Sequence, residues 1–410
     1  MKKKYKEIAD CEVCGEKLLS PVALNLGNHA LCDDLVKIGS TRKCLEYPIE
    51  IYYCINCRTA HQRYQVPKAE LFKSTYHYRA RFTADVINGM GDLVQSCQEK
   101  FGSLSKKKVI DIGCNDGSLL NIFRDAGGIT VGIEPTEACE EARASGHRVY
   151  KDFLSKDLAS QIVQQNGKQD FITFTNVFAH IEDLKGVLEA VSELMHPSSI
   201  LIVENHYLGA VLKGNQFDTF YHEHPRTYSY RSFEWIAKSL GLVVLGVEYP
   251  ERYGGNIRVF MGPHNLSKLS EKDISLIEDD ELMFGDLFVK LAGDVSRWRV
   301  EKRKHLVGLA MKHGRIQAKA FPGRAAILFK LLDLNEEIIE GVYEKPGSLK
   351  IGNYVPGTKI PILSDDSLNL NSSSPLINMA WHIPKEIRGY LKGIGYRGEV
   401  EDILSPQDFG

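Results

Sequence analysis

The chain has 410 residues, of which 43% are hydrophobic, enough to form the cores of two or three domains. Its 51 basic and 53 acidic residues nearly balance and form no long runs of one sign, which argues against non-specific electrostatic binding of nucleic acid. We therefore expect the partners to be small molecules or proteins. We also expect a monomer or weak homo-oligomer.

The first seventy residues contain two cysteine pairs with metal-ligand spacing. The pairs are Cys11 with Cys14 and Cys54 with Cys57, and 39 residues lie between them. Two such turns can present four thiolates to one Zn²⁺ ion in a closed tetrahedral site, which leaves no position for an activated water. The pattern predicts a structural zinc domain over residues 1–70. A redox pair or unrelated thiols are the alternative, with Cys32 and Cys44 as unpaired rival ligands.

The same region indicates a reducing compartment. All nine cysteines precede residue 140, an odd number that favours free thiols and metal ligation over disulfides. The N-terminal lysines are not followed by an apolar stretch, and about 18 consecutive apolar residues occur nowhere. We expect a cytoplasmic protein without a membrane span.

Residues 106–263 alternate between strand-like and helix-like runs. Predicted strands occupy 108–113, 129–135, 147–153, 170–181 and 199–206, with helices predicted at 137–146 and 183–194. A helix at 232–241 then leads to a predicted hairpin of 242–249 and 255–262. A doubly wound α/β pattern that ends in a hairpin is typical of the class I Rossmann-like S-adenosylmethionine (SAM)-dependent methyltransferases.

The loop after the first predicted strand has the features of a cofactor site. It reads D-I-G-C-N-D-G, and its candidate cofactor-binding residues are Asp111, Gly113, Asn115, Asp116 and Gly117. Its glycines allow the backbone to approach a ligand, and Asn115 replaces the second glycine of a dinucleotide fingerprint, which disfavours pyrophosphate. Glu134 lies 21 residues after Gly113, where an acidic residue can bind a ribose diol. Together they predict an adenosyl cofactor.

The fourth predicted strand supplies further candidates. Because ligands of open α/β sheets lie at the carboxyl ends of the strands, Asn176 and Phe178 are expected to border the cofactor and His180 to face the reacting centre. A structural histidine that is simply hydrogen-bonded is the alternative for His180.

Five blocks of sequence resemble the bacterial sugar C-methyltransferases of deoxysugar biosynthesis. The blocks are DIGCNDGSLL, NVFAHIEDL, FDTFYHEHPRTYS, YGGNIRVF and PGTKIPIL. The resemblance spans nearly the whole chain and implies a zinc domain over 1–70, a SAM domain over 71–265 and a helical and α/β substrate domain over 266–410. It also implies methylation of a ring carbon beside the ketone of a nucleotide-linked 4-keto-6-deoxy sugar.

The resemblance also implies catalytic roles in the block Y-H-E-H. A carbon beside a carbonyl becomes nucleophilic only after a proton is removed, so the reaction needs a base and a group that stabilises the enolate. His224 is the expected base, Glu223 a group that orients or polarises its neighbours, and Tyr221 a donor to the oxyanion. His222 would point away if the segment is extended. Metal binding by these adjacent side chains is disfavoured because they project in different directions.

Two segments depart from the family pattern. The region before the first strand has Ala80 and Phe82 where serines are expected, although Tyr76 still matches a residue of the cofactor or substrate pocket. In the third domain, Pro322-Gly323-Arg324 replaces a glycine-rich turn, which bears on the sugar or nucleotide that is recognised.

Three other functions fit parts of the pattern. A nitrogen or oxygen of a sugar, cyclitol or natural product would need a less demanding base than carbon. A non-catalytic protein that binds a sugar nucleotide would not need both the cofactor loop and the Y-H-E-H block. A nucleic-acid methyltransferase that uses the zinc unit as a reader is disfavoured by the balanced charge.

Overall fold

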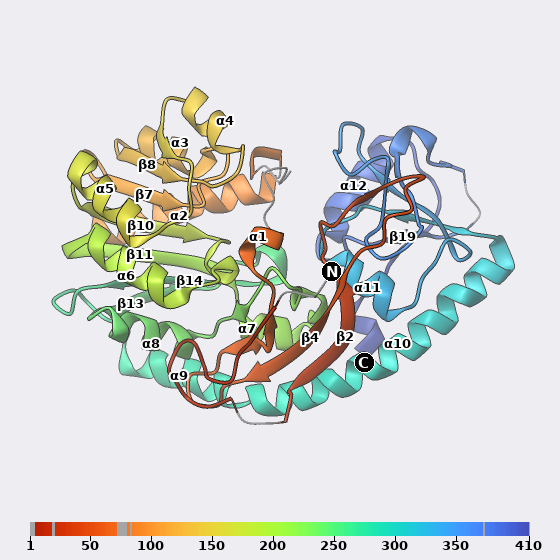
Figure 1. Cartoon of the computed structure of the whole chain (residues 1–410), viewed down its shortest axis with the longest axis horizontal. Helices are drawn as coiled ribbons and strands as arrows, with labels where there is room; N and C mark the ends of the chain where they lie inside the picture. Colours follow the sequence, from red (N-terminus) through yellow and green to blue (C-terminus); the bar gives the residue numbers. More distant parts are fainter. Residues whose placement is uncertain (1–4, 19–20, 72–79, 83, 372–373, 410) are drawn as a thin grey trace.

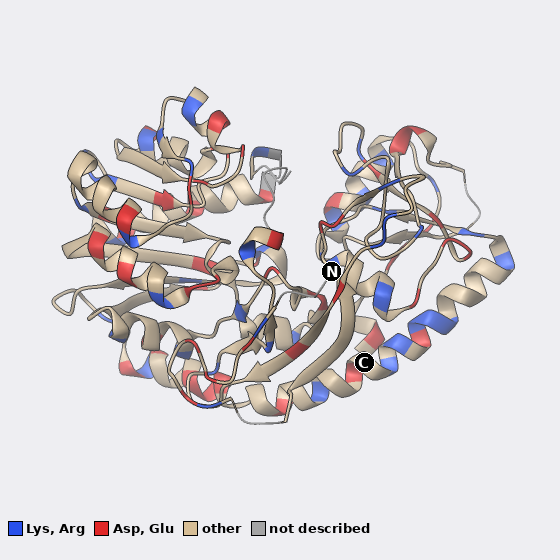
Figure 2. Cartoon of the chain, in the orientation of Figure 1, with Lys and Arg blue, Asp and Glu red and all other residues tan. Residues whose placement is uncertain are grey.

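The structure is a computed structural model that describes residues 5–18, 21–71, 80–82, 84–371 and 374–409. Two lobes lie side by side, and the long helix α10 (Phe284–His313) runs along the base of the molecule to the second lobe (Figure 1). Acidic and basic side chains are interspersed over both lobes (Figure 2). Among the described residues, no helix is both long and apolar enough to cross a membrane.

The larger lobe is built on a sheet with the strand order β13-β14-β11-β10-β7-β8-β9. Its strands are β7 (Lys108–Ile112), β8 (Ile129–Ile133), β9 (Arg148–Tyr150), β10 (Gln169–Thr175), β11 (Met195–His206), β13 (Val243–Glu248) and β14 (Asn256–Gly262). Pairs from β11 to β9 are parallel, and β14 is antiparallel to both of its neighbours. The predicted doubly wound sheet with a terminal hairpin is confirmed.

Helices cover both faces of this sheet. They are α2 (Ala84–Phe101), α3 (Ser118–Asp125), α4 (Cys139–Ala144), α5 (Lys156–Asn166), α6 (Leu184–Leu194) and α8 (Tyr230–Ser239). One apolar cluster joins α2 and α3 to the strands, and another joins α5, α6 and α8 to them. Burial on both faces explains why the strand sequences are apolar runs and do not alternate with polar residues.

The N-terminal unit shares a sheet with the segment that carries the Y-H-E-H block. The sheet has the order β12-β5-β4-β2 and consists of β2 (Leu24–Ala30), β4 (Glu46–Tyr53), β5 (Ala60–Gln62) and β12 (Arg226–Thr227). A smaller ladder pairs β1 (Lys6–Glu7) with β6 (Tyr64–Gln65). In the β12–β5 pair, Arg226 faces His61 and Thr227 faces Ala60. The zinc-binding candidate is therefore joined directly to the candidate catalytic segment.

The second lobe contains another parallel sheet, with the order β18-β16-β15-β19-β20. In the chain, this sheet follows helices α9 (Glu271–Leu282) and α10. Its strands are β15 (Ile316–Lys319), β16 (Ile339–Glu344), β18 (Ile362–Ser364), β19 (Leu376–Asn378) and β20 (Val400–Asp402). The lobe also contains helices α11 (Ala325–Leu331) and α12 (Pro384–Gly393). The strand order reverses between β15 and β19, so this second sheet has its own topological switch point. A smaller α/β unit is confirmed at this end of the chain.

Contacts between the lobes also involve the N-terminal unit. Strand β17 (Asn353–Tyr354) pairs with β3 (Val36–Lys37). Short helical segments form connections near the sheet ends. They are α1 (Lys68–Leu71), η1 (Ala80–Phe82), η2 (Phe178–His180), α7 (Leu208–Lys213), η3 (Phe217–Thr219) and η4 (Arg252–Gly254). Further one-turn segments, η5 (Asp365–Ser367) and η6 (Pro406–Phe409), lie in the second lobe.

Candidate active site

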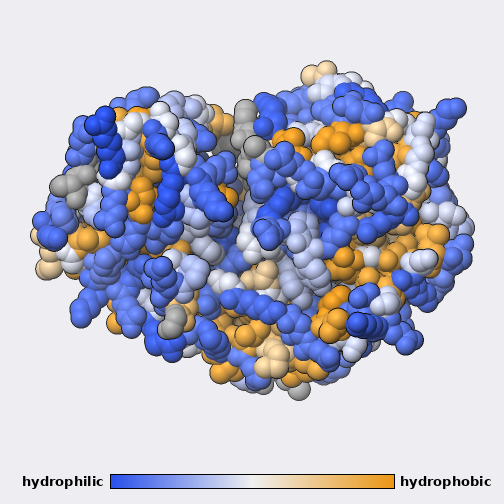
Figure 3. Space-filling view, turned by 180° about the vertical axis from the view of Figure 1, so that it is seen from behind, coloured by the Kyte–Doolittle hydropathy of each residue, from blue (hydrophilic) through white to orange (hydrophobic). Residues whose placement is uncertain are grey.

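A cavity of about 1490 Å³ lies between the two lobes. Its wall combines the carboxyl ends of β7, β8, β10 and β11 with the Y-H-E-H segment and loops of the second lobe. The space-filling view from behind shows a recess between the lobes (Figure 3). Since a pocket for one drug-sized ligand usually has about 300 to 1,000 Å³, this cavity is large enough for a cofactor together with an acceptor.

Glu134 anchors the loop predicted to hold the cofactor. Its Oε2 accepts a hydrogen bond from the backbone N–H of Asn115 at 3.0 Å, and its Oε1 accepts one from the backbone N–H of Thr136 at 2.9 Å. Asn115 has a left-handed backbone with φ 49°. Glu134 and Asn115 both line the cavity, where the remaining lone pairs of the carboxylate can accept from ligand hydroxyl groups.

Asp111 lies at the end of β7 and also lines the cavity. Its Oδ1 accepts a hydrogen bond of 2.7 Å from the Thr173 hydroxyl, and burial raises the pKa of its carboxyl to about 7. Asp111 is therefore a carboxyl group that can carry a proton near neutral pH.

The two glycines of the loop have different positions. At Gly113, where φ is 74°, a Cβ atom would lie 2.5 Å from a methyl group of Val177, so the close approach of β7 to this side chain requires glycine. Gly117 begins helix α3 with φ 81° and lies against Ala142. Asp116 accepts hydrogen bonds from the N–H and hydroxyl of Ser118 and shapes the same turn. Gly113 borders the cavity, whereas Asp116 and Gly117 shape the loop without bordering it, in contrast to the expectation.

The residues after β10 are divided between the cavity and the core. Asn176 ends the strand with φ 55° and lines the cavity, where its Oδ1 accepts a hydrogen bond of 3.1 Å from Asn256. Phe178 is fully buried and packs against the rings of Phe174, Tyr228 and Phe233. Phe178 therefore does not border the cavity, contrary to the expectation, because the chain turns after Asn176 and directs this ring into the core. Tyr76 lies outside the described residues.

Three histidine rings meet on the cavity wall. The His224 ring lies 4.8 Å from that of His180 and 5.3 Å from that of His206, and the Tyr221 ring lies 4.3 Å from His224 (centroid distances). The backbone N–H of His224 donates to the carbonyl of Tyr221 at 2.9 Å, so Tyr221, Glu223 and His224 reach the cavity from one turn. The structure thus brings the predicted catalytic residues together.

The hydrogen bonds of two histidines place a proton on a ring nitrogen of each. His224 Nδ1 lies 2.9 Å from the carbonyl oxygen of Thr219, and His180 Nδ1 lies 2.8 Å from that of Glu223. Because a carbonyl oxygen only accepts, Nδ1 carries a proton in each ring. In a neutral His224 the lone pair is therefore on Nε2, whereas the ring of His180 is also held by a backbone hydrogen bond to Asn176. Burial, followed by the neighbouring rings of His180 and His206, holds the pKa of His224 well below its ordinary value. His224 is therefore neutral near pH 7 and has the protonation state of a base.

The pKa of Glu223 is shifted upward, in the direction opposite to that of His224. Burial and the nearby carboxylate of Asp33 raise its pKa well above the ordinary value, and Lys350 partly opposes this shift. All three residues line the cavity. A protonated Glu223 can donate a hydrogen bond, which an ionised carboxylate cannot do.

His222 points away from the cavity, as anticipated, but for another reason. The segment is a turn and not an extended strand, and His222 Nε2 lies 3.1 Å from the carbonyl oxygen of Tyr47 on β4. His29 on β2 makes a similar bond of 2.8 Å to the carbonyl of Leu26. Both imidazoles are buried with only 1% to 3% of their surface exposed.

Because of these two buried histidines, we expect the protein to lose stability in mild acid. Burial lowers the pKa of both His29 and His222 to about 4. Below about pH 6.5 the unfolded chain binds protons that the folded chain excludes, so the free energy of unfolding falls as the pH falls toward 4. From pH 7.5 to 5.5 each histidine is expected to contribute about 1 kcal/mol to this loss. Urea unfolding at both pH values measures it, and the double variant His29→Gln/His222→Gln should lose about 2 kcal/mol less than the unsubstituted protein over this interval. An equal pH dependence in both proteins would contradict this assignment.

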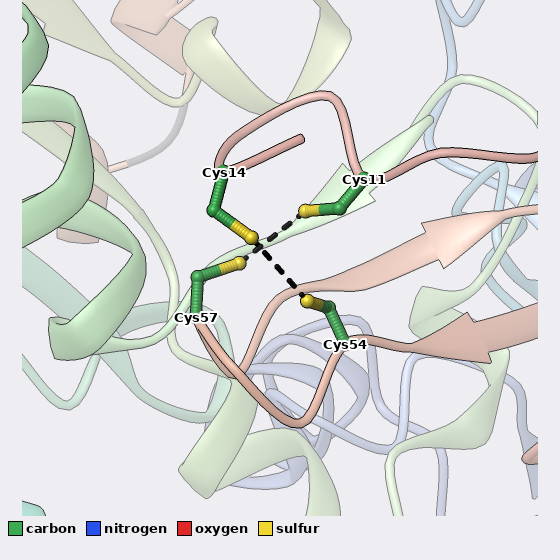
Figure 4. A group of neighbouring side chains, drawn as sticks. All are labelled: Cys11, Cys14, Cys54 and Cys57. Atoms are coloured by element: carbon green, nitrogen blue, oxygen red, sulfur yellow. Dashed lines mark hydrogen bonds between the residues drawn. The ribbon is translucent and has the colours of Figure 1, made fainter. Parts of the chain in front are cut away.

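The four predicted zinc ligands converge from two turns (Figure 4). The ligand atoms of Cys11, Cys14, Cys54 and Cys57 all lie within 4.8 Å of one another. Sulfur–sulfur distances are 3.3 Å for Cys11–Cys57 and 3.6 Å for Cys14–Cys54, near the roughly 3.8 Å that a tetrahedral zinc–thiolate site implies. The set fits Zn²⁺ and leaves no open coordination position.

Neighbouring side chains support the thiolates of this site. His61 Nε2 lies 3.2 Å from Cys11 Sγ, and Thr59 Oγ1 lies 3.0 Å from Cys57 Sγ. Cys44 donates instead to the backbone carbonyl of Asp34, and Cys32 is also outside the four-cysteine group. The rival ligands considered from sequence are therefore excluded from this site.

Sequence reasoning missed several residues of the cavity wall. Asn205 and His206 end β11, so the rule that ligands lie at carboxyl ends of strands could have identified them. Arg324 and His382 come from the second lobe, and their place in the wall depends on how the lobes pack, which no local pattern encodes.

Comparisons with known proteins agree with this organisation. Three family models match: "Putative zinc binding domain" over residues 11–72, "Methyltransferase domain" over 77–247 and "C-methyltransferase C-terminal domain" over 251–400. The chain is 27% identical to the C-methyltransferase NovU of Streptomyces niveus over 93% of this chain and 91% of that protein. It is 29% identical to the ubiquinone biosynthesis O-methyltransferase of Escherichia coli K12, over 24% of this chain and 42% of that protein.

Two solved structures are also similar. One is magnesium protoporphyrin IX methyltransferase (ChlM) from Synechocystis PCC 6803 with bound SAM, at 15% identity and a TM-score of 0.34, with coverage of 44% of this chain and 80% of that chain. The other is the mitomycin 7-O-methyltransferase MmcR, at 18% identity and a TM-score of 0.35, with coverage of 43% of this chain and 53% of that chain.

Proposed function

We propose that the chain is a SAM-dependent C-methyltransferase whose acceptor is a nucleotide-linked 4-keto-6-deoxy sugar. This is supported by the matches to the zinc-binding, methyltransferase and C-methyltransferase C-terminal family models and by the similarity to the C-methyltransferase NovU. Methylation would occur on a ring carbon beside the ketone. The observation that carries the proposal is His224, a neutral imidazole with its proton fixed on Nδ1, at the edge of the sheet where the cofactor is expected.

His224 is the proposed base that removes the proton beside the ketone. Its Nε2 lone pair accepts the proton while Nδ1–H donates to the carbonyl of Thr219, which holds the ring in place. The carbanion is stabilised as an enolate, and SAM, when bound, supplies the methyl group that this carbon takes. The resulting imidazolium then returns its proton to water or buffer.

Tyr221 is the proposed donor to the enolate oxygen. His180 is held by backbone hydrogen bonds to Glu223, 2.8 Å from Nδ1, and to Asn176, which fix its ring between the Y-H-E-H turn and the end of β10. We therefore give His180 the role of positioning the Y-H-E-H turn. Glu223, with its raised pKa, is the proposed second donor or polarising group.

The cofactor is proposed to lie along the loop after β7. Glu134 would bind the ribose hydroxyls, while Asp111, Gly113, Asn115 and Asn176 form the adjacent cavity wall. The domain division remains 1–70, 71–265 and 266–410 in this proposal, with the acceptor between the second and third units.

Replacement of Glu134 tests the position of the cofactor. Glu134→Gln is expected to weaken SAM binding by about 10- to 100-fold, because it removes a charged acceptor from the ribose site and from the N–H of Asn115. Isothermal titration with SAM measures the loss. The matched control is Glu137→Gln, since Glu137 is exposed and pairs with Lys151. Equal SAM affinity in both variants would contradict the proposed position.

The function is tested by incubating the purified protein with SAM and a panel of nucleotide-linked 4-keto sugars. We expect a mass gain of one methyl group and a new carbon–carbon bond in the NMR spectrum of the product. A methyl group on nitrogen or oxygen would replace the proposal with the alternative chemistry. Binding of a sugar without binding of SAM would support a non-catalytic protein instead.

A further inference from the structure

Four residues that line the cavity each have a buried side-chain polar atom with no hydrogen-bond partner in the part of the chain that the structure describes. One is Thr175 at the end of β10, through Oγ1, and the other three atoms are Asn205 Nδ2, Thr219 Oγ1 and His382 Nδ1. Buried polar atoms in folded proteins are nearly always hydrogen-bonded. Unpaired atoms on the wall of a large cavity therefore indicate partners that arrive with a ligand.

The unpaired atoms of Asn205 and Thr219 lie beside the proposed reacting centre. Asn205 directly precedes His206 at the end of β11, and its Oδ1 accepts the backbone N–H of Ala179 at 3.4 Å. Because that bond fixes the oxygen, the amide nitrogen is the end of the side chain without a partner. Thr219 uses its carbonyl to hold the proton on His224, and its hydroxyl is left unpaired.

The unpaired atom of His382 comes from the switch point of the second sheet. His382 follows β19, and the preceding residue Trp381 donates from Nε1 to Asp218 Oδ2 at 2.9 Å. Arg324, at the loop after β15, donates from Nε and Nη2 to both oxygens of Asp218 at 2.9 and 2.5 Å. Asp218 is fully buried and precedes Thr219. This bridge across the lobes therefore holds Thr219 and His382 in the same part of the cavity.

We propose that Asn205, Thr219 and His382 determine specificity by binding the oxygen substituents of the acceptor ring. This inference rests on the proposed function and adds to it the residues that recognise the acceptor. The amide nitrogen donates to a ketone or hydroxyl oxygen, the threonine hydroxyl donates and accepts, and the imidazole nitrogen pairs with a hydroxyl. An acceptor ring without these oxygens would leave three buried groups unpaired, which discriminates strongly against it.

The test compares Thr219→Val with Thr219→Ser. Valine has the shape of threonine but lacks the hydroxyl, whereas serine keeps it. Binding of a nucleotide-linked 4-keto sugar is measured calorimetrically with S-adenosylhomocysteine present. Thr219→Val is expected to raise the Kd of the sugar about tenfold, and Thr219→Ser to leave it within about twofold. The affinity for S-adenosylhomocysteine should be unchanged in both.

A second readout uses the free protein. Since the Thr219 hydroxyl makes no bond within the described residues, Thr219→Val should not lower the thermal midpoint without ligand. The matched control Thr173→Val should lower it, because the Thr173 hydroxyl donates to Asp111. A lowered thermal midpoint of Thr219→Val would contradict this inference but leave the proposed function intact. The same holds if Thr219→Val and Thr219→Ser bind the sugar with equal affinity. Failure of the unsubstituted protein to bind any sugar of the panel would overturn the proposed function and this inference together.

Discussion

Replacement of His224 by asparagine is expected to lower kcat for carbon methylation by about 10²- to 10⁴-fold, the usual contribution of a general base. Asparagine can still donate to the carbonyl of Thr219 in place of Nδ1–H, but it has no basic nitrogen to accept the carbon-bound proton. The affinity for SAM should be unchanged because the proposed cofactor residues are separate. Steady-state kinetics and calorimetry measure the two quantities.

His222 provides the matched control for this substitution. It lies two residues away and is also buried, but it points to the carbonyl of Tyr47 and not into the cavity. His222→Gln keeps a donor for that carbonyl and should retain kcat within about threefold. If His224→Asn kept full activity, or if His222→Gln lost as much as His224→Asn, the assignment of the base would be wrong.

Loss of zinc is expected to abolish activity although the ion lies outside the cavity. Binding of structural zinc by four cysteines has an apparent free energy of about 10 to 16 kcal/mol, comparable to the roughly 5 to 15 kcal/mol that stabilises a whole domain. Cys54→Ser removes one ligand at the turn between β4 and β5, and β5 pairs with β12 just after His224. Disorder at the zinc site should therefore reach the catalytic segment.

This prediction is checked by the zinc content, the thermal midpoint and the methyl-transfer rate of Cys54→Ser. Cys44→Ser is the control, because this thiol donates to Asp34 and does not belong to the four-cysteine group. The control should keep one zinc per chain and its activity. A Cys54→Ser variant with full zinc content and normal activity would contradict the structural role of the site.

The parts of the fold that follow local rules were predictable from sequence. Buried parallel strands are apolar runs, so 129–135 identified β8 closely and 199–206 identified β11 from Ser199 to its end, although the strand begins at Met195. The cysteine turns were predictable because metal ligation requires fixed spacing of its ligands. The strand predicted over 170–181 was too long, since Asn176 adopts a left-handed conformation and ends β10 at Thr175.

Residues whose orientation depends on packing were harder to predict. The sequence NVFAHI does not reveal that Phe178 enters an aromatic cluster while His180 turns to the carbonyl of Glu223. Nor does it show that Asp218 receives hydrogen bonds from Arg324 and Trp381, which are more than 100 residues away in the chain. The atypical turn at Pro322-Gly323-Arg324 thus supplies a contact between the lobes that has no local signal.

The most direct test of the proposed chemistry is hydrogen exchange at the acceptor carbon in deuterated water. A nucleotide-linked 4-keto sugar is incubated with the protein in the absence of SAM, and deuterium incorporation is followed by mass spectrometry. We predict incorporation beside the ketone with the unsubstituted protein and little above the uncatalysed rate with His224→Asn. Equal incorporation with both proteins, at a sugar that the unsubstituted protein methylates on carbon, would contradict proton removal by His224.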